Sequence, residues 1–378
     1  MSSESKIEWT DATWQVTSGC REWSPGCLHC FATRQAHRMG ANPNAKIAGR
    51  YRGLTVVKAG APRWTGEVRE LADQLAVPMR WGKGRRVFVN SLSDLFQEGV
   101  SDGHIAAVFG VMAMCQRHTF QVLTKRPDRM RDWFSAMGKV TSRMHPGPVE
   151  VCIGEAIRRG VAPAACDTEY DWPLSNVWLG TSVEDQQRAE ERLPHLLATP
   201  AEVRFVSVEP LLGPLDLGPW LPGVDICARC GHQQQRCDGD PCVACHDTSP
   251  TAGFTLAELH QVIVGGESGP GARPMHPAWA RSLRDQCHKA HVPFFFKQWG
   301  EWAPDPLGDR AVFLNGQHAP NLEPHGTNGT GSVRIRRVGK GAAGRLLDGV
   351  EWSGEPVVVG HGWQRGLRFR GHTSAESL

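Results

Sequence analysis

The sequence predicts an α/β protein built around a partial TIM-like (β/α)6 barrel, and three observations support this fold class. Six short runs rich in Val, Ile and Phe recur along the chain, and each ends abruptly in polar residues. Helical patterns follow most of these runs, and such strand–helix alternation is typical of a parallel sheet. The runs are also apolar almost without interruption, as expected for strands buried on both faces of the sheet.

The predicted strands lie between residues 86 and 299. They cover residues 86–91, 119–125, 176–182, 203–209, 261–267 and 292–299. We expect helices over residues 101–117, 127–137, 184–198 and 276–290. Ser101 suits an N-cap and Pro127 suits a first helical turn, whereas Pro194 predicts a kink or a break.

Three segments do not follow this alternation. Residues 139–175 are predicted to form an irregular excursion from the barrel, and residues 222–256 a cysteine-rich, zinc-ribbon-like insertion. We therefore expect a barrel domain over residues 1–302 that contains both segments. Residues 303–378 are Gly-rich and carry several clustered basic side chains, so we expect an irregular, basic C-terminal appendage.

The composition of the 378-residue chain indicates a folded protein without a membrane partner. Hydrophobic residues make up 40% and charged residues 21%, and the net charge of +3 neither requires nor excludes nucleic acid. The polar N-terminus is not a signal peptide, and the apolar run over residues 105–115 is too short to span a bilayer. We expect a cytoplasmic protein, whose clustered cysteines indicate metal binding rather than disulfides.

The first cysteine cluster has the pattern C-x₆-C-x₂-C and consists of Cys20, Cys27 and Cys30. Pro and Gly between the first two cysteines favour a loop that wraps around a compact group. Three thiolates hold three irons of a [4Fe–4S] cluster and leave the fourth iron open. The alternative is a zinc site completed by His29 or by a distant residue.

The second cysteine cluster contains two C-x₂-C pairs, formed by Cys227, Cys230, Cys242 and Cys245. This arrangement resembles a zinc ribbon, and it predicts a structural zinc ion that staples the insertion. A second iron–sulfur cluster on the same four cysteines is the alternative.

Polar side chains gather where the predicted strands end. In parallel α/β folds ligands bind at the carboxyl ends of the strands, so we expect these residues to bind a cofactor. They are Asn90, Ser91, Asp94, Lys125, Arg126, Ser182, Glu184, Glu209, Gly265, Gly266 and Glu267.

Three of the strand ends also supply candidate catalytic residues. Lys125 and Lys297 suit an anionic group, and Glu209 ends a strand that is otherwise buried. A salt bridge between Glu209 and Arg126 is the structural alternative. Gly265 and Gly266 permit close backbone approach to a ligand, or alternatively form a tight turn.

The three-cysteine loop ahead of a series of parallel βα units resembles the radical SAM superfamily, although its first gap has six residues rather than three. A closer resemblance covers nearly the whole chain and relates it to a bacteriophage-associated family of three-cysteine-motif, radical-SAM-like proteins. A weaker likeness to spore photoproduct lyase hints at nucleobase chemistry. The segments that carry the closer resemblance include KIEWTDATW, SPGCLHC, NSLSDLF, FQVLTKRP, NVWLGTSVEDQ and PFFFKQWG.

The resemblance implies a radical SAM enzyme. Cys20, Cys27 and Cys30 would hold a [4Fe–4S] cluster, and S-adenosylmethionine would chelate the open iron. An electron donor such as flavodoxin or ferredoxin would reduce the cluster, and the cofactor would then release a 5′-deoxyadenosyl radical. The substrate would be a nucleobase or nucleotide. The alternative from another class is a non-enzymatic, zinc-stapled protein that binds nucleic acid through its basic tail.

Overall fold

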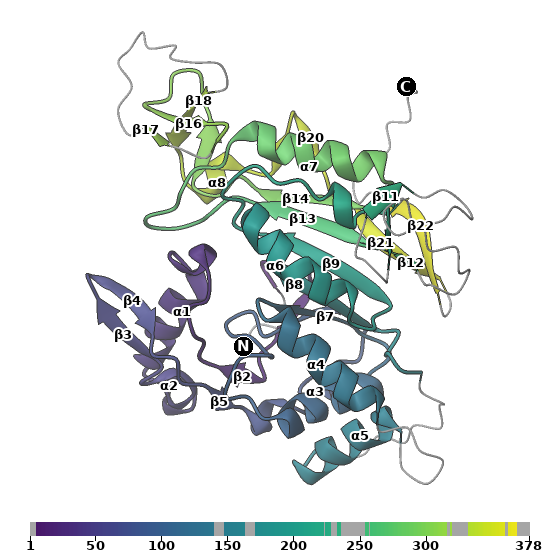
Figure 1. The fold of residues 1–378 in the computed structure, drawn as a ribbon. Coiled ribbons are helices and arrows are strands. Elements are labelled where there is room, and N and C mark those ends of the chain that lie inside the picture. The colour runs from purple at the N-terminus through teal and green to yellow at the C-terminus, as the bar shows by residue number, and fades with distance from the viewer. Residues whose placement is uncertain are drawn as a thin grey trace. The chain divides into compact units, whose positions relative to one another are not determined.

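The structure is a computed structural model in which the chain forms two compact units (Figure 1). One unit comprises Met1–Glu184, Glu190–Ser207 and Ser268–Ala272, and the other comprises Asp185–Ala189, Val208–Glu267 and Arg273–Leu378. The predicted division into residues 1–302 and 303–378 stays a prediction. The structure describes residues 5–139, 147–162, 171–222, 224–227, 233–235, 254–256, 258–315, 318–319, 332–359 and 362–368.

The described residues contain seven parallel strands in the order β1-β6-β7-β8-β9-β13-β14, which confirms the α/β class. All six predicted strands are present, and β1 was not predicted. The finer TIM-like description stays a prediction. β13 and β14 belong to the second unit. The strands are β1 (Ala12–Trp14), β6 (Arg86–Val89), β7 (Thr119–Thr124), β8 (Val177–Ser182), β9 (Val203–Val208), β13 (Gln261–Gly265) and β14 (Phe294–Gln298).

The core of the first unit lies on both faces of its parallel strands. Every residue of β8 is buried, as expected for a strand covered on both sides. Trp9 packs against Phe88 with ring centroids 4.6 Å apart, and Trp14 packs against Phe120 at 5.6 Å. Both tryptophans are therefore part of the sheet core.

The predicted helices are confirmed as α3 (Asp102–Met114), α4 (Pro127–Gly138), α6 (Gln186–Leu197) and α7 (Pro277–Lys289). Ser101 caps α3, since its hydroxyl oxygen accepts a hydrogen bond from the His104 N–H at 3.2 Å. Pro127 begins α4 as expected. The predicted break in α6 is wrong, because the helix continues through Pro194.

The excursion predicted at residues 139–175 is not irregular throughout, because it contains α5 (Pro148–Arg158). Val149, Cys152 and Ala156 are buried on one side of this helix, and α5 lies against α3 (Figure 1). The helical spacing of three small or medium apolar residues was too weak a signal for sequence reasoning to separate from a loop.

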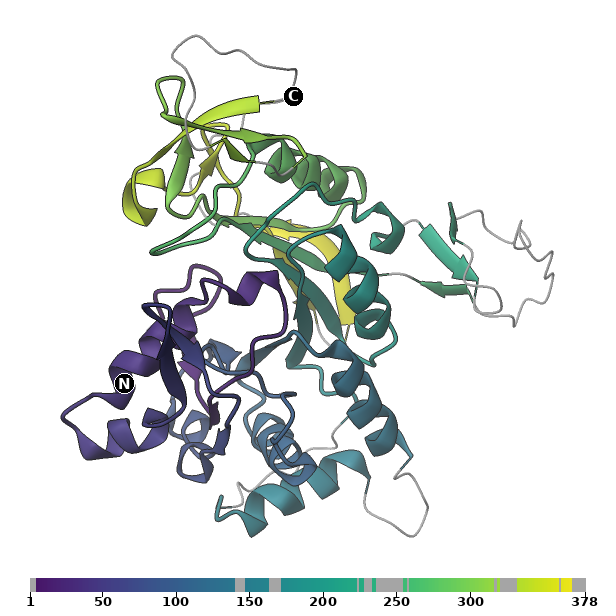
Figure 2. The same cartoon turned by 60° about the vertical axis from the view of Figure 1, so that its left-hand side comes forward.

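A small N-terminal layer lies between β1 and β6 in the sequence (Figure 2, purple). It has its own apolar core, made by Ala32, Ala36, Tyr51, Leu54 and Trp64. Its elements are β2 (Thr17–Ser18), η1 (Pro25–Cys27), α1 (Phe31–Gly40), α2 (Ala45–Tyr51), β3 (Thr55–Lys58), β4 (Ala61–Trp64) and β5 (Arg69–Glu70), followed by η2 (Ala72–Gln74) and η3 (Pro78–Arg80).

The predicted insertion at residues 222–256 follows η4 (Gly218–Trp220) and contains a small antiparallel sheet in the order β11-β10-β12. Its strands are β10 (Val224–Cys227), β11 (Gln233–Gln235) and β12 (Phe254–Leu256). Cys230, Cys242, Cys245 and the side chain of Cys227 lie outside the described residues, so the zinc site stays a prediction.

The C-terminal part was expected to be irregular, and this expectation is wrong for several described segments. An antiparallel sheet runs in the order β15-β18-β16-β17. Its strands are short, and the stretches between them in the sequence contain Gly, which hid their alternation. The elements are β15 (Trp302–Pro304), β16 (Arg310–Phe313), β17 (His318–Ala319), β18 (Ser332–Arg337), α8 (Lys340–Ala343), β19 (Leu346–Leu347), β20 (Val350–Glu351), β21 (Glu355–Val359) and β22 (Gly362–Arg368).

Among the described residues, no helix has the length and apolar character needed to cross a membrane.

Candidate functional site

The three N-terminal cysteines lie on the loop that joins β2 to α1. Gly19, directly before Cys20, has a φ of +88°, and a Cβ there would lie 2.1 Å from the Glu67 carbonyl oxygen. Glycine is therefore required where the loop begins. Cys27 ends the short helix η1, and Cys30 occupies the N-cap position of α1.

The thiols of this loop are partly exposed and lie close enough to influence one another. Burial raises the pKa of Cys20, the Asp94 carboxylate raises it further, and Arg126 acts in the opposite direction. Burial also raises the pKa of Cys30, and the charge of Cys27 adds to that effect. These two thiols are therefore neutral near pH 7, and a bound metal would have to displace their protons.

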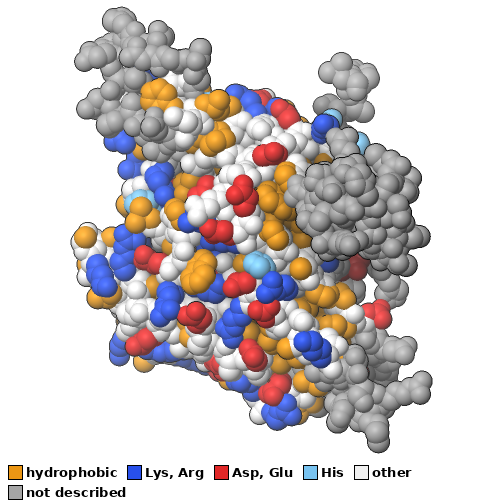
Figure 3. Space-filling view, viewed as in Figure 1, with side chains coloured by type: hydrophobic (Ala, Val, Ile, Leu, Met, Phe, Trp, Pro, Cys, Tyr) orange, Lys and Arg blue, Asp and Glu red, His pale blue; other side chains and the backbone are white. Residues whose placement is uncertain are grey.

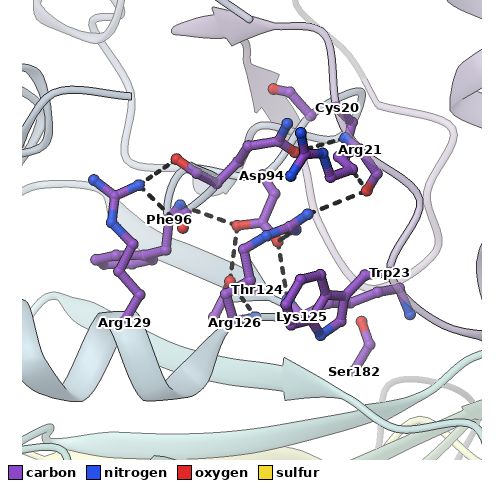
Figure 4. Close-up of polar contacts among 12 residues, drawn as sticks. Cys20, Arg21, Trp23, Asp94, Phe96, Thr124, Lys125, Arg126, Arg129 and Ser182 are labelled. Atoms are coloured by element: carbon purple, nitrogen blue, oxygen red, sulfur yellow. Dashed lines mark hydrogen bonds and ion pairs between the residues drawn. The ribbon is translucent and has the colours of Figure 1, made fainter. Parts of the chain in front are cut away.

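Asp94 and Arg126 form a buried ion pair beside the cysteine loop (Figure 4). The Asp94 carboxylate accepts hydrogen bonds from the Phe96 N–H at 3.0 Å and the Thr124 hydroxyl at 2.7 Å. Its other oxygen accepts from the Lys125 N–H and from Arg126 Nη1, both at 2.9 Å. This carboxylate thus joins the turn after β6 to the end of β7, and it fixes the Arg126 guanidinium.

Arg126 in turn holds the first half of the cysteine loop. Its Nη2 donates a hydrogen bond to the Arg21 carbonyl oxygen at 3.1 Å, and its guanidinium lies 5.1 Å from the centroid of the Trp23 ring. The Arg21 N–H donates to Gln97 Oε1 at 2.8 Å. The loop between the first two cysteines is therefore attached to the end of the parallel sheet through side chains (Figure 4).

Glu184 holds the second half of the loop from the residues after β8. Its Oε1 accepts a hydrogen bond from the Ser24 hydroxyl at 2.7 Å and also contacts the Lys125 ammonium. Its Oε2 accepts from Arg192 Nη1 at 3.2 Å. A Cβ on Gly26 would lie 2.6 Å from Glu184 Cγ, so η1 packs directly on this side chain.

The environment of Glu184 keeps it ionised. Burial by itself would raise the pKa of this carboxyl group, but the charges of Lys125 and Arg192 and the hydrogen bond from Ser24 hold the pKa below its usual range. Glu184 therefore binds the loop as a carboxylate.

Several predicted cofactor ligands have their polar atoms occupied by the protein itself. Asn90 is buried with a φ of +60°, and its Oδ1 accepts from the Val16 N–H at 2.9 Å and the Thr17 N–H at 3.1 Å. Asp94 and Glu184 are similarly occupied. These three side chains shape the loop, whereas Lys125 reaches solvent with 21% of its side chain exposed. Ser91 is partly exposed in the turn after β6, and Ser182 is buried at the end of β8.

The remaining predicted residues lie in the second unit. Glu209 pairs with Lys297 at 2.9 Å, and Arg126 pairs with Asp94 rather than with Glu209. The Glu267 carboxylate accepts from Arg273 Nη2 at 2.6 Å and Nε at 2.9 Å.

The glycine pair of the second unit is packed against the chain itself. A Cβ on Gly266 would lie 1.9 Å from the Trp299 carbonyl oxygen, and one on Gly265 would lie 2.7 Å from Glu209 Oε1. Both glycines therefore permit a close approach of the protein's own atoms, and their role toward a ligand stays a prediction.

The family to which the chain belongs follows from a family model that matches residues 4–356, described as "Protein of unknown function (DUF5131)". The chain belongs to the DUF5131 family. No curated protein and no solved structure matches this DUF5131 chain.

Sequence reasoning missed three residues that hold the loop of this DUF5131 chain, namely Ser24, Thr124 and Arg192. Ser24 and Thr124 carried no signal beyond their hydroxyl groups. Arg192 lies on α6, eight residues after Glu184, and Glu184 precedes this helix. Helical spacing therefore gave no signal for the pair. Within the described residues of the DUF5131 chain, no three His, Cys, Asp or Glu side chains are grouped around the position of a single metal ion.

Proposed function

We propose that this DUF5131 protein binds a [4Fe–4S] cluster through Cys20, Cys27 and Cys30 and acts with S-adenosylmethionine as a radical SAM-type enzyme on a nucleobase or nucleotide. One observation carries the proposal. Two buried carboxylates attach the three-thiol loop to the carboxyl ends of β6, β7 and β8, where α/β proteins bind their ligands.

The donor set of this loop favours an iron–sulfur cluster with one open iron, because the stretch supplies three cysteines. A closed structural zinc site takes four protein ligands. In a cluster each thiolate binds a different iron. The Trp23 N–H donates to Cys27 Sγ at 3.4 Å, and hydrogen bonds of this kind tune the potential of a cluster.

The residues of the loop and the sheet would supply the environment for this group. When bound, the cluster would supply a single electron to the sulfonium of S-adenosylmethionine. The cations Lys125, Arg126 and Arg192 face two carboxylates, Asp94 and Glu184, so this buried set carries one excess positive charge. Such an excess favours an anionic group such as the carboxylate of the cofactor.

Metal analysis of anaerobically purified protein tests the proposal. We expect brown protein with about four irons per chain bound by the loop. Cys27→Ala should lose this iron, whereas the matched variant Cys287→Ala, in α7, should keep it. With dithionite and S-adenosylmethionine, the wild-type protein should release 5′-deoxyadenosine and the Cys27→Ala protein should not.

A colourless protein that contains zinc and no iron would refute the proposal. That result would instead support the non-enzymatic, zinc-stapled protein that binds nucleic acid. Unchanged release of 5′-deoxyadenosine by Cys27→Ala would refute the assignment of the loop.

A further inference from the structure

Two exposed aromatic side chains flank the candidate cluster site. Among the described residues, the large apolar side chains that are exposed include just two aromatic ones, Trp23 at 49% and Phe31 at 52%. Leu28, exposed by 45%, lies between them in the sequence. Single exposed apolar residues need no explanation, but three within nine residues around the thiols of this loop indicate a contact surface.

The Trp23 ring is held in place from the protein side. The Arg126 guanidinium lies 5.1 Å from the ring centroid, and that guanidinium is itself fixed by Asp94 and by the Arg21 carbonyl oxygen. The backbone N–H of Trp23 donates to Cys27 Sγ. Nearly half of the side chain nevertheless remains exposed. The indole is thus a fixed aromatic platform with surface available to a flat partner.

The segment that contains this platform is strongly basic. Residues 21–63 hold eight Lys and Arg residues and one acid, Glu22, which gives a net charge of 8 − 1 = +7. Because the whole chain carries +3, the remaining residues carry 3 − 7 = −4. This asymmetry is typical of a surface that binds a polyanion.

Four of these cations are exposed and form no salt bridge among the described residues, namely Arg38, Lys46, Arg52 and Lys58. The charge of Lys46 acts on Asp73 without a salt bridge between them. They belong to α1, α2, β3 and the turns beside them, and Figure 3 shows Lys and Arg side chains along this edge of the molecule. The small core of this layer also contacts Cys20 and Cys30. The basic surface and the thiol loop therefore belong to one packed layer.

We propose that residues 21–63 bind single-stranded nucleic acid, with a base stacked on Trp23 and the phosphates on the exposed cations. A basic surface combined with an exposed aromatic is the arrangement by which proteins bind single strands. An acidic protein partner would satisfy the charge but would not need the fixed indole. This inference rests on the proposed function, because it names the substrate class of that same site.

Fluorescence anisotropy with a labelled 12-nucleotide single-stranded DNA tests the inference on the full chain. Trp23→Ala should weaken binding roughly 5- to 150-fold, the range expected for one lost base–aromatic stack. Trp23→Phe should retain most of the affinity. Arg158→Gln, an exposed cation on α5 outside the segment, is the matched control and should leave binding unchanged.

A second variant tests the cations. In the second variant Arg38, Lys46, Arg52 and Lys58 are all changed to Gln. The slope of log K against log salt concentration should become less negative by up to about 3, since each phosphate contact to a single strand contributes about 0.7 to this slope. Polyglutamate serves as a polyanion without bases. Its binding should fall in the four-residue variant and stay unchanged in Trp23→Ala.

Three results would overturn the inference: no binding of the DNA at low salt, equal binding by wild-type and both variants, or equal weakening of DNA and polyglutamate by Trp23→Ala. The last result would indicate an acidic protein as the partner. The measurement needs no cluster, so it separates the two proposals. A wild-type protein that contains iron but does not bind the DNA contradicts this inference alone. A wild-type protein that binds the DNA but contains no iron contradicts the proposed enzyme alone.

Discussion

Removing the Asp94 carboxylate should destabilise the first unit more than removing any exposed acid. In Asp94→Ala, Arg126 would keep its buried position, with 5% of its side chain exposed, but would lose its carboxylate partner. Breaking a buried ion pair by removing one partner costs about 3–5 kcal/mol. Three further hydrogen bonds to this carboxylate would also be lost.

Urea unfolding followed by circular dichroism measures this loss. With a urea dependence of about 1–3 kcal/mol per molar, the midpoint should fall by about 1 M or more. Asp102→Ala is the matched control, because Asp102 also pairs with an arginine, Arg129 at 3.2 Å, but is 77% exposed. That variant should cost no more than about 1 kcal/mol.

The double variant Asp94→Asn/Arg126→Met gives a second check. The double variant leaves no unpaired buried charge. Its loss of unfolding free energy should therefore be smaller than the sum of the losses in Asp94→Asn and Arg126→Met. The reasoning would be refuted if Asp94→Ala shifted the midpoint no further than Asp102→Ala does.

Three further predictions concern the loop. Gly26→Ala should lower the iron content of the protein, because the new Cβ would lie 2.6 Å from Glu184 Cγ. Gly49→Ala is the control glycine substitution, because nothing lies within 4 Å of its new Cβ. This second variant should raise the free energy of unfolding by about 0.5–1 kcal/mol in urea unfolding, since Gly49 lies in α2. The pKa of Glu184 is lower in the folded protein than in the unfolded chain, where it is about 4.3. Its carboxylate therefore stabilises the folded state fully above about pH 4.3, and this stabilisation is lost as the pH falls through the folded pKa. The urea midpoint of Glu184→Gln should therefore fall less on acidification than that of wild type, and an equal fall would contradict the lowered pKa. Asn90→Ala should lower the free energy of unfolding by about 1–3 kcal/mol in the same assay, because it leaves buried N–H groups without an acceptor. Ser91→Ala is the near-neutral control. An unchanged midpoint together with weaker cofactor binding would favour the ligand role of Asn90 instead.

The strands were predictable from the sequence because each buries most of its residues in one continuous run. β8 is buried at every position, and so is β13. β1 could not be predicted, because it has three residues, Ala12–Trp14, between polar neighbours. α1 was also missed, since just Ala32, Thr33 and Ala36 of its ten residues are buried and the others are mostly polar.

The residue types at the strand ends were predictable, but their partners were not. Asp94 and Glu184 were expected to contact a cofactor, which stays a prediction, and the structure shows that both hold the cysteine loop. Local pattern gives no information on a pair such as Ser24 and Glu184, which are 160 residues apart. The sign of charge that Glu209 would attract was predictable, whereas the choice of Lys297 over Arg126 depends on the topology.

The attachment of Ser24 to Glu184 has a consequence for biosynthesis. A ribosome adding about 5–20 residues per second needs roughly 10–30 s to travel the 160 residues between them. During that interval the thiols are already synthesised, but the carboxylate that orients their loop does not yet exist. If the loop binds a cluster as proposed, metal that reached the nascent chain before residue 184 was translated would meet a loop without this attachment. The proposed cluster would then be inserted into its oriented loop after the synthesis of β8 and the residues that follow it.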